Sequence, residues 1–141
     1  MADNLTIKDS AAATQTIRAR EYAAVKYPQI IDWARQRVHS AATTNATSVK
    51  ASAGTIGGIY VTNTNAAVRY LKLYNKASAP TVGTDVPVWT IAIPANSERD
   101  IPIPGGMAFS TGIAFAITTG AADTDATAVA ANEITGAIAY L

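Results

Sequence analysis

The feature that most constrains the fold is a series of short runs in which apolar and polar residues alternate. For example, Leu71 and Leu73 lie on the face of an extended segment opposite to Tyr70. The runs predict strands at residues 54–62, 68–74, 86–93, 98–103, 107–118 and 134–141. Strands of this length that are bounded by Gly, Pro and Asn indicate an all-β sandwich or barrel.

The segments between these runs carry the residues that favour turns and loops. Residues 75–85 form a predicted loop, and Gly105-Gly106 predicts a turn between two strands. Pro102 and Pro104 indicate an edge strand or a bulge, because proline cannot donate to a sheet ladder. Residues 120–133 predict a long ordered loop with room for a short helix.

The N-terminal third is patterned more weakly than the rest. Residues 1–50 carry seven Lys/Arg and four Asp/Glu, a net charge of +3, whereas residues 51–141 carry four and six, a net charge of −2. We expect an extended arm and linker over 1–46 and a β-sandwich domain over 47–141. The arm either reaches onto a neighbouring subunit or folds back and adds strands to its own sandwich.

Composition excludes several classes of function. The chain has 141 residues, the length of one domain, with a net charge of +1 and 15% charged residues. The small charge argues against nucleic acid or an anionic membrane as a partner. The absence of cysteine excludes disulfides and thiolate metal sites. Asp3 and Asp9 near the start predict no signal peptide, and no run approaches the roughly 18 apolar residues of a membrane span.

The sequence contains no set of residues that indicates a catalytic, cofactor-binding or metal-binding site. His39 is the single histidine and has no evident partner for a triad. Asp123 and Asp125, with Glu133 further on, are the nearest to a calcium loop, but the spacing does not match an EF-hand. The charges of residues 98–100 are typical of a sheet edge or an interface.

Two groups of residues indicate a binding surface. Arg35 and Arg37 lie two apart, near Trp33, and suit an acidic patch on a protein better than nucleic acid. Tyr70 and Tyr74 lie on one face of their strand, and Tyr60 is a candidate third member of the same aromatic face. Such a face forms either a sugar platform or part of a protein interface.

Two longer stretches resemble a known family. The residues YVTNTNAAVRYLKLYNKASAPTVGTDVPVWTIAIPANS and GGMAFSTGIAFAITTGAADTDATAV resemble a recurrent module of tailed-bacteriophage virion structural proteins, over roughly residues 53–141. The opening of the chain, with Tyr27-Pro28-Gln29-Ile30, is similar to the start of phage structural proteins.

The resemblance implies a non-enzymatic virion protein with a jelly-roll-like β-sandwich preceded by an extended arm. We expect a capsid decoration (cement) protein, assembled in the host cytoplasm, that stabilises the capsid lattice. Its expected partners are the major capsid protein and copies of itself, as a homotrimer. The alternative is a neck, tail or head-fibre accessory protein that binds a host receptor or glycan. Because interface hot spots favour Trp, Tyr and Arg, the predicted interface residues are Tyr22, Tyr27, Trp33, Arg35, Arg37, Tyr70 and Tyr74.

Overall fold

The computed structural model describes residues 5–8, 14–17 and 32–141, and the chain divides into two units, Met1–Asp32 and Trp33–Leu141. In the first unit, β1 (Leu5–Lys8) and β2 (Thr14–Ile17) pair as an antiparallel hairpin. The division differs from the expected boundary at 46/47. The physical reason is that residues 34–39 pair with the last strand of the chain and so belong to the sandwich.

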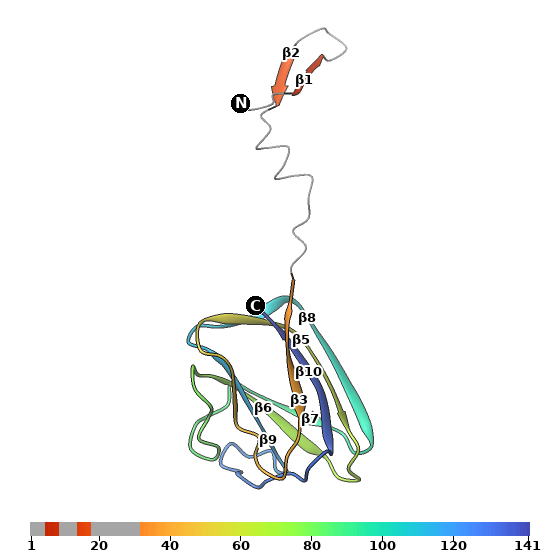
Figure 1. Ribbon diagram of the computed structural model, residues 1–141, viewed down its shortest axis with the longest axis vertical. Helices are drawn as coiled ribbons and strands as arrows, with labels where there is room; N and C mark the ends of the chain where they lie inside the picture. Colours follow the sequence, from red (N-terminus) through yellow and green to blue (C-terminus); the bar gives the residue numbers. More distant parts are fainter. Residues whose placement is uncertain (1–4, 9–13, 18–31) are drawn as a thin grey trace. The chain divides into compact units, whose positions relative to one another are not determined.

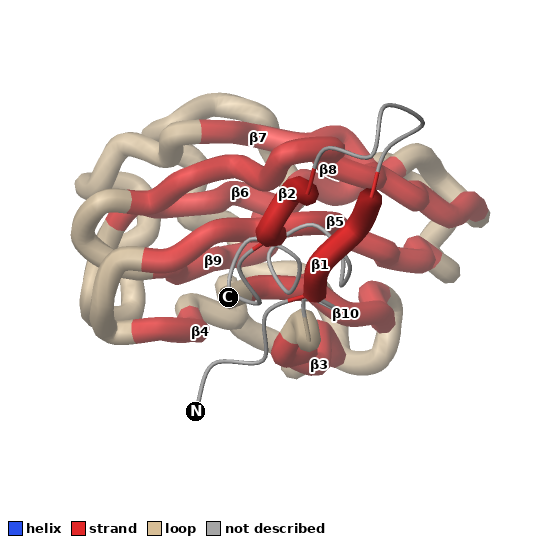
Figure 2. Tube along the Cα trace, turned by 90° about the horizontal axis from the view of Figure 1, so that it is seen from above, coloured by secondary structure: helices blue, strands red, loops and turns tan. Residues whose placement is uncertain are grey.

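The second unit is an all-β sandwich, as the sequence predicts (Figure 1). Its eight strands are β3 (Ala34–His39), β4 (Thr47–Lys50), β5 (Gly54–Asn63), β6 (Arg69–Asn75), β7 (Trp89–Ile93), β8 (Ser97–Phe109), β9 (Ile113–Thr118) and β10 (Ile134–Tyr140). They form two antiparallel four-stranded sheets, in the orders β3-β10-β5-β8 and β4-β9-β6-β7 (Figure 2). The described residues contain no helix.

The hydrophobic core lies between the two sheets and is built from the inward side chains of the alternating runs. Leu71, Leu73, Ile113 and Ile138 are completely buried. Each such side chain contributes about 1.5–3 kcal/mol by leaving water. The remaining core residues are Val38, Ile56, Ile59, Val61, Ile91, Ile93, Phe109, Phe115, Ile117, Val129 and Ile134.

The predicted turn at Gly105-Gly106 is wrong, because β8 continues through it. Both glycines have positive φ, 82° and 78°. The pairing with β5 jumps from Pro102↔Gly58 to Met107↔Ile56. The glycines therefore form a bulge within one long edge strand, and the chain leaves this sheet only after Phe109.

Residues 34–50 fold back onto their own sandwich, the second of the two alternatives for the arm. The buried Ser40 hydroxyl accepts hydrogen bonds from the backbone N–H groups of Glu133 and Ile134 and donates to the carbonyl of Ala130. Asn45, with φ of 52°, bonds the backbone of Ala41 through its amide. These bonds make the polar stretch an ordered crossing from one sheet to the other.

Candidate interaction surface

The two central strands of the sheet β4-β9-β6-β7 are covered on both faces. All six residues of β9 are buried, and so are Leu71, Lys72, Leu73 and Tyr74 of β6. The inward side chains pack in the core, while the outward ones lie under the loops 76–88 and 119–133, which run beside β6 and β9 in Figure 1. Within the described part of the chain, the outer face of this sheet is therefore open only at its edge strands, where Ser48 and Ala92 are exposed.

Lys72 holds the loop 119–133 against the sheet. Its ammonium donates to the carbonyl oxygens of Ala122, at 2.6 Å, and Asp125, at 3.0 Å. Burial lowers the pKa of Lys72, and the carboxylates of Asp125 and Asp123 offset part of this change. Asp123 and Asp125, the acidic residues that come nearest to a calcium loop in the sequence, thus act on a cation that the chain itself supplies.

Glu133, the third of those acidic residues, lies elsewhere, in a nearly buried ion pair. Its carboxylate accepts from the guanidinium of Arg69 at 2.6 Å, from the Asn65 amide at 2.6 Å and from the Ala130 N–H at 2.9 Å. Burial alone would raise the pKa of Glu133, but the hydrogen bonds and charge of Arg69 and the bonds from Ala130 and Asn65 lower it overall. The pair ties the end of the loop to β6.

We expect Lys72→Met to lower the free energy of unfolding by about 2 kcal/mol, because two carbonyl groups lose their charged donor. Hydrogen exchange should show faster exchange in residues 119–133. Lys76→Met is the matched control, since Lys76 pairs with Asp85 in a partly exposed position. Unchanged exchange in the Lys72 variant would contradict the role given to this ammonium.

Tyr70 and Tyr74 do not form the exposed aromatic face that the sequence predicts. Tyr74 is 1% exposed and packs with Ala114, Ala116 and Val82. Its hydroxyl has no hydrogen-bond partner among the described residues. Burial raises the pKa of this hydroxyl. Tyr74 is therefore removed from the set of interface candidates, while Tyr70, four residues earlier on β6, is half-buried.

The sheet β3-β10-β5-β8 has an outer face that no described loop covers, and we call it the bare face. Arg35, Arg37 and His39 point outward from β3 as a basic column. Glu98 and Asp100 on β8, at the opposite edge of the sheet, form an acidic column. Neither column makes an ion pair with another described residue.

Trp33 lies at one end of the bare face and packs on Gly57. A Cβ atom at Gly57 would overlap three carbon atoms of the indole ring, so only glycine leaves room for it. Gly57 sits in the irregularity where the pairing of β5 with β8 shifts. Trp33 is thus a half-buried residue of the sandwich, whereas Tyr22 and Tyr27 lie outside the described residues.

The middle of the bare face is a shallow hollow of about 200 Å³. Small residues of β5 and β10, Gly58, Ala137 and Ala139, line it, between Arg35 and Asp100 at its sides. Tyr60 is 46% exposed, and its hydroxyl donates to Glu98 Oε2 at 2.7 Å. This bond holds the ring across the sheet toward the acidic column.

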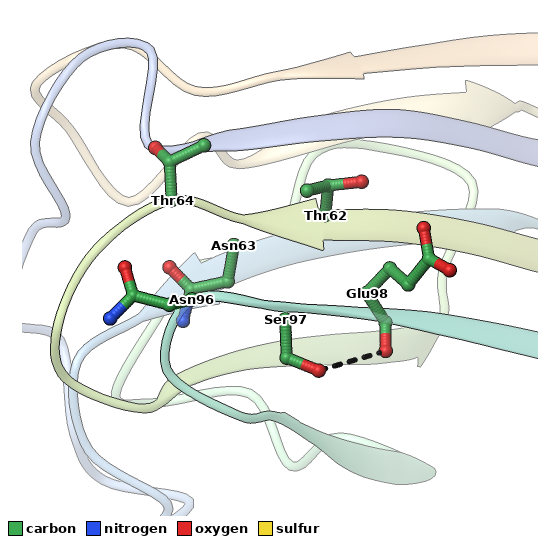
Figure 3. Close-up of a pocket in the computed structure, with 6 residues that line it drawn as sticks. All are labelled: Thr62, Asn63, Thr64, Asn96, Ser97 and Glu98. Carbon is green, nitrogen blue, oxygen red and sulfur yellow. Dashed lines mark hydrogen bonds between the residues drawn. The ribbon is translucent and has the colours of Figure 1, made fainter.

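A second, polar hollow of about 550 Å³ lies where β5 ends and β8 begins (Figure 3). It is lined by Thr62, Asn63, Thr64, Asn96, Ser97 and Glu98. The Asn63 amide is buried and donates to the carbonyls of Ala67, Ile93 and Pro94. Asn96 and Thr64 are exposed, and the Thr64 hydroxyl donates to the carbonyl of Glu133.

No family model, curated protein or solved structure matches this sequence. Across residues 5–8, 14–17 and 32–141, no three His, Asp or Glu residues are grouped so that they could hold a metal ion. The same residues include no helix of the length and apolarity that crossing a membrane requires.

Sequence reasoning identified part of the bare face and missed the rest. As predicted, Arg35 and Arg37 lie on the same face of one strand, and Trp33 lies at the end of that face. Asp100 was expected at a sheet edge or an interface, and Tyr60 in an aromatic face with Tyr70 and Tyr74, but the two were not predicted to lie side by side. The missing information was the pairing Tyr60↔Asp100, which no local pattern contains.

Proposed function

We propose that this chain is a non-enzymatic structural protein of a virion, and that it acts as a capsid decoration protein on the major capsid lattice. The observation that carries the proposal is the difference between the two sheets. The central strands of one sheet are buried on both faces. The other sheet has an uncovered outer face with an exposed tyrosine and opposite charges at its two edges. Such a face suits contact with neighbouring subunits.

The fold supports the proposal at a coarser level. We infer a jelly-roll arrangement from the strand orders β3-β10-β5-β8 and β4-β9-β6-β7, since two interleaved Greek keys place eight strands in this way. Viral capsid and lectin domains are among the proteins built on that plan. The sequence resemblance to phage virion modules points in the same direction.

The partners we propose are the major capsid protein and copies of the chain itself. Trp33, Arg35 and Arg37 are the anchors, because the two arginines are exposed and the indole lies next to them on the same sheet. Repetition over a lattice multiplies a modest contact at each site.

The second candidate is a neck, tail or head-fibre accessory protein that binds a glycan. The observation in its favour is the polar hollow of Figure 3, whose lining includes the amide of Asn96, the hydroxyl of Thr62 and the carboxylate of Glu98. These groups are of the kind that recognise sugar hydroxyls.

Copy number per virion, measured by quantitative mass spectrometry against the major capsid protein, separates the two. A ratio near parity or a simple lattice fraction is the result expected for decoration. A few to a few dozen copies per particle would replace decoration with the accessory role.

We also expect Trp33→Ala to weaken attachment to capsid shells while the sandwich stays folded. The ring is half-buried, so its loss should destabilise the fold by much less than the about 3–5 kcal/mol of a core aromatic. Gly57→Ala is the companion variant, since it displaces the indole without removing it. Cosedimentation with shells measures attachment, and circular dichroism measures folding. Normal attachment of both variants would remove Trp33 from the anchors.

A further inference from the structure

The bare face consists of rows that run across all four strands in the order β3-β10-β5-β8. The central row is Arg37, Ala137, Tyr60 and Asp100, as the pairing of these strands shows. Reversed, the row reads Asp100, Tyr60, Ala137, Arg37. When the row of one copy lies against the reversed row of a second copy, each arginine meets an aspartate and each tyrosine meets an alanine.

The row on one side of it carries a single charge. It consists of Arg35, Ala139, Gly58 and Pro102. When it is reversed, the two small central residues meet each other, so the two backbones can approach closely. No like charges are brought together.

The row on the other side consists of His39, Thr135, Thr62 and Glu98. In the reversed row, the imidazole of His39 lies opposite the carboxylate of Glu98, and Thr135 lies opposite Thr62. The Arg37 and His39 rows are therefore complementary to themselves in charge, and the central row is also complementary in size. The Arg35 row places each arginine opposite a proline, without a counter-charge.

We propose that the bare face binds the bare face of a second copy of this chain, around a two-fold axis parallel to the strands. This inference rests on the proposed role of the bare face as a subunit contact, and it identifies the contacting subunit as a second copy of the chain. The axis places β3 of one copy over β8 of the other, so the basic column meets the acidic column twice. An in-plane axis perpendicular to the strands would instead place like charges over each other.

The contact is expected to be a small one. Four strands about 4.8 Å apart and five residues at about 3.3 Å each give a projected area of roughly 300 Å² per copy. That size belongs to weak, transient interfaces, so the dimer forms at high protein concentration or on a lattice. Its charged rim makes it sensitive to salt.

Sedimentation equilibrium of the full chain, up to about 1 mM and at low salt, tests the proposal. The variants are Arg37→Glu, Asp100→Lys and the double variant. Each single reversal turns two attractive contacts per dimer into repulsive ones, so the dimer dissociation constant should rise at least about tenfold. The double variant should return to within about threefold of the wild type.

Two further measurements sharpen the result. Mixing the two single variants should restore a dimer with one copy of each, detected by native mass spectrometry, because every contact is then attractive. Arg99→Glu is the matched control, since Arg99 lies on the same strand but donates to the Ala92 carbonyl of the other sheet. It should leave the dissociation constant unchanged.

A chain that stays monomeric over this range overturns the inference, and so does a dimer that both single reversals leave unaffected. A monomer that attaches to capsid shells through Arg37 would assign the face to the capsid protein instead, leaving the decoration role intact. If the dimer forms as predicted but the protein never attaches to capsid shells, the self-association stands and the decoration role is overturned. The two proposals therefore fail separately.

Discussion

Glu133→Ala is expected to lower the free energy of unfolding by about 3–5 kcal/mol, one of the largest effects of any single substitution in this chain. The carboxylate is 5% exposed and Arg69 is 12% exposed, so removing Glu133 leaves a nearly buried guanidinium without its counter-charge. The Asn65 amide and the Ala130 N–H lose their acceptor as well. Urea denaturation measures the loss.

The double variant Arg69→Met/Glu133→Leu tests the explanation. Replacing both members of a nearly buried pair by apolar residues costs far less than removing one of them. The double variant should therefore be more stable than Glu133→Ala. Asp85→Ala, which removes a partly exposed pair with Lys76, is the control for a general effect of lost charge. Equal destabilisation by Glu133→Ala and Asp85→Ala would contradict the importance of burial.

The same carboxylate makes stability depend on pH. Because folding lowers the pKa of Glu133 below its ordinary value of 4.5, its contribution is complete above that pH and is lost as the pH falls through the folded-state pKa. Glu133→Gln should therefore flatten the dependence of stability on pH below about pH 5. A wild-type slope retained in this variant would assign the acid sensitivity to other carboxylates.

Gly136→Ala is expected to have the second large effect, a loss of about 3 kcal/mol, at the upper end of what overpacking costs. A Cβ atom there would overlap the carbonyl oxygen of Tyr60 and lie 2.8 Å from the Cα atom of Val61. Both obstacles are backbone atoms of the neighbouring β5, so no side-chain rotation can relieve the overlap. Thermal unfolding measures the change.

Gly105→Ala is the matched control for this prediction. Gly105 has φ of 82°, so alanine is strained there, but nothing lies within 4 Å of its added Cβ atom. It should cost only about 1 kcal/mol, the conformational penalty alone. If the two variants are equally stable, β10 and β5 are not packed closely enough at Gly136 for a Cβ atom to overlap the backbone of Tyr60.

Local patterns in the sequence predicted most of the strands, because the period of two and the turn residues are properties of neighbouring positions. The runs 54–62 and 68–74 fall within one residue of β5 and β6. Gly105-Gly106 misled the prediction, because two glycines permit both a turn and a bulge, and only pairing with β5 selects the bulge.

The candidate surface depended on information of another kind. Alternation alone directs Tyr60 and Tyr74 to the outward faces of their strands, and the sequence offers no reason to prefer one as a contact residue. The loop 76–88 carries Val82 onto Tyr74 and buries it, while no described loop reaches Tyr60. The sequence by itself determined an all-β chain with its inward and outward positions. Only the tertiary structure decided which outward face stays exposed and which charges share it, because strand order and loop coverage depend on contacts between residues far apart in the chain.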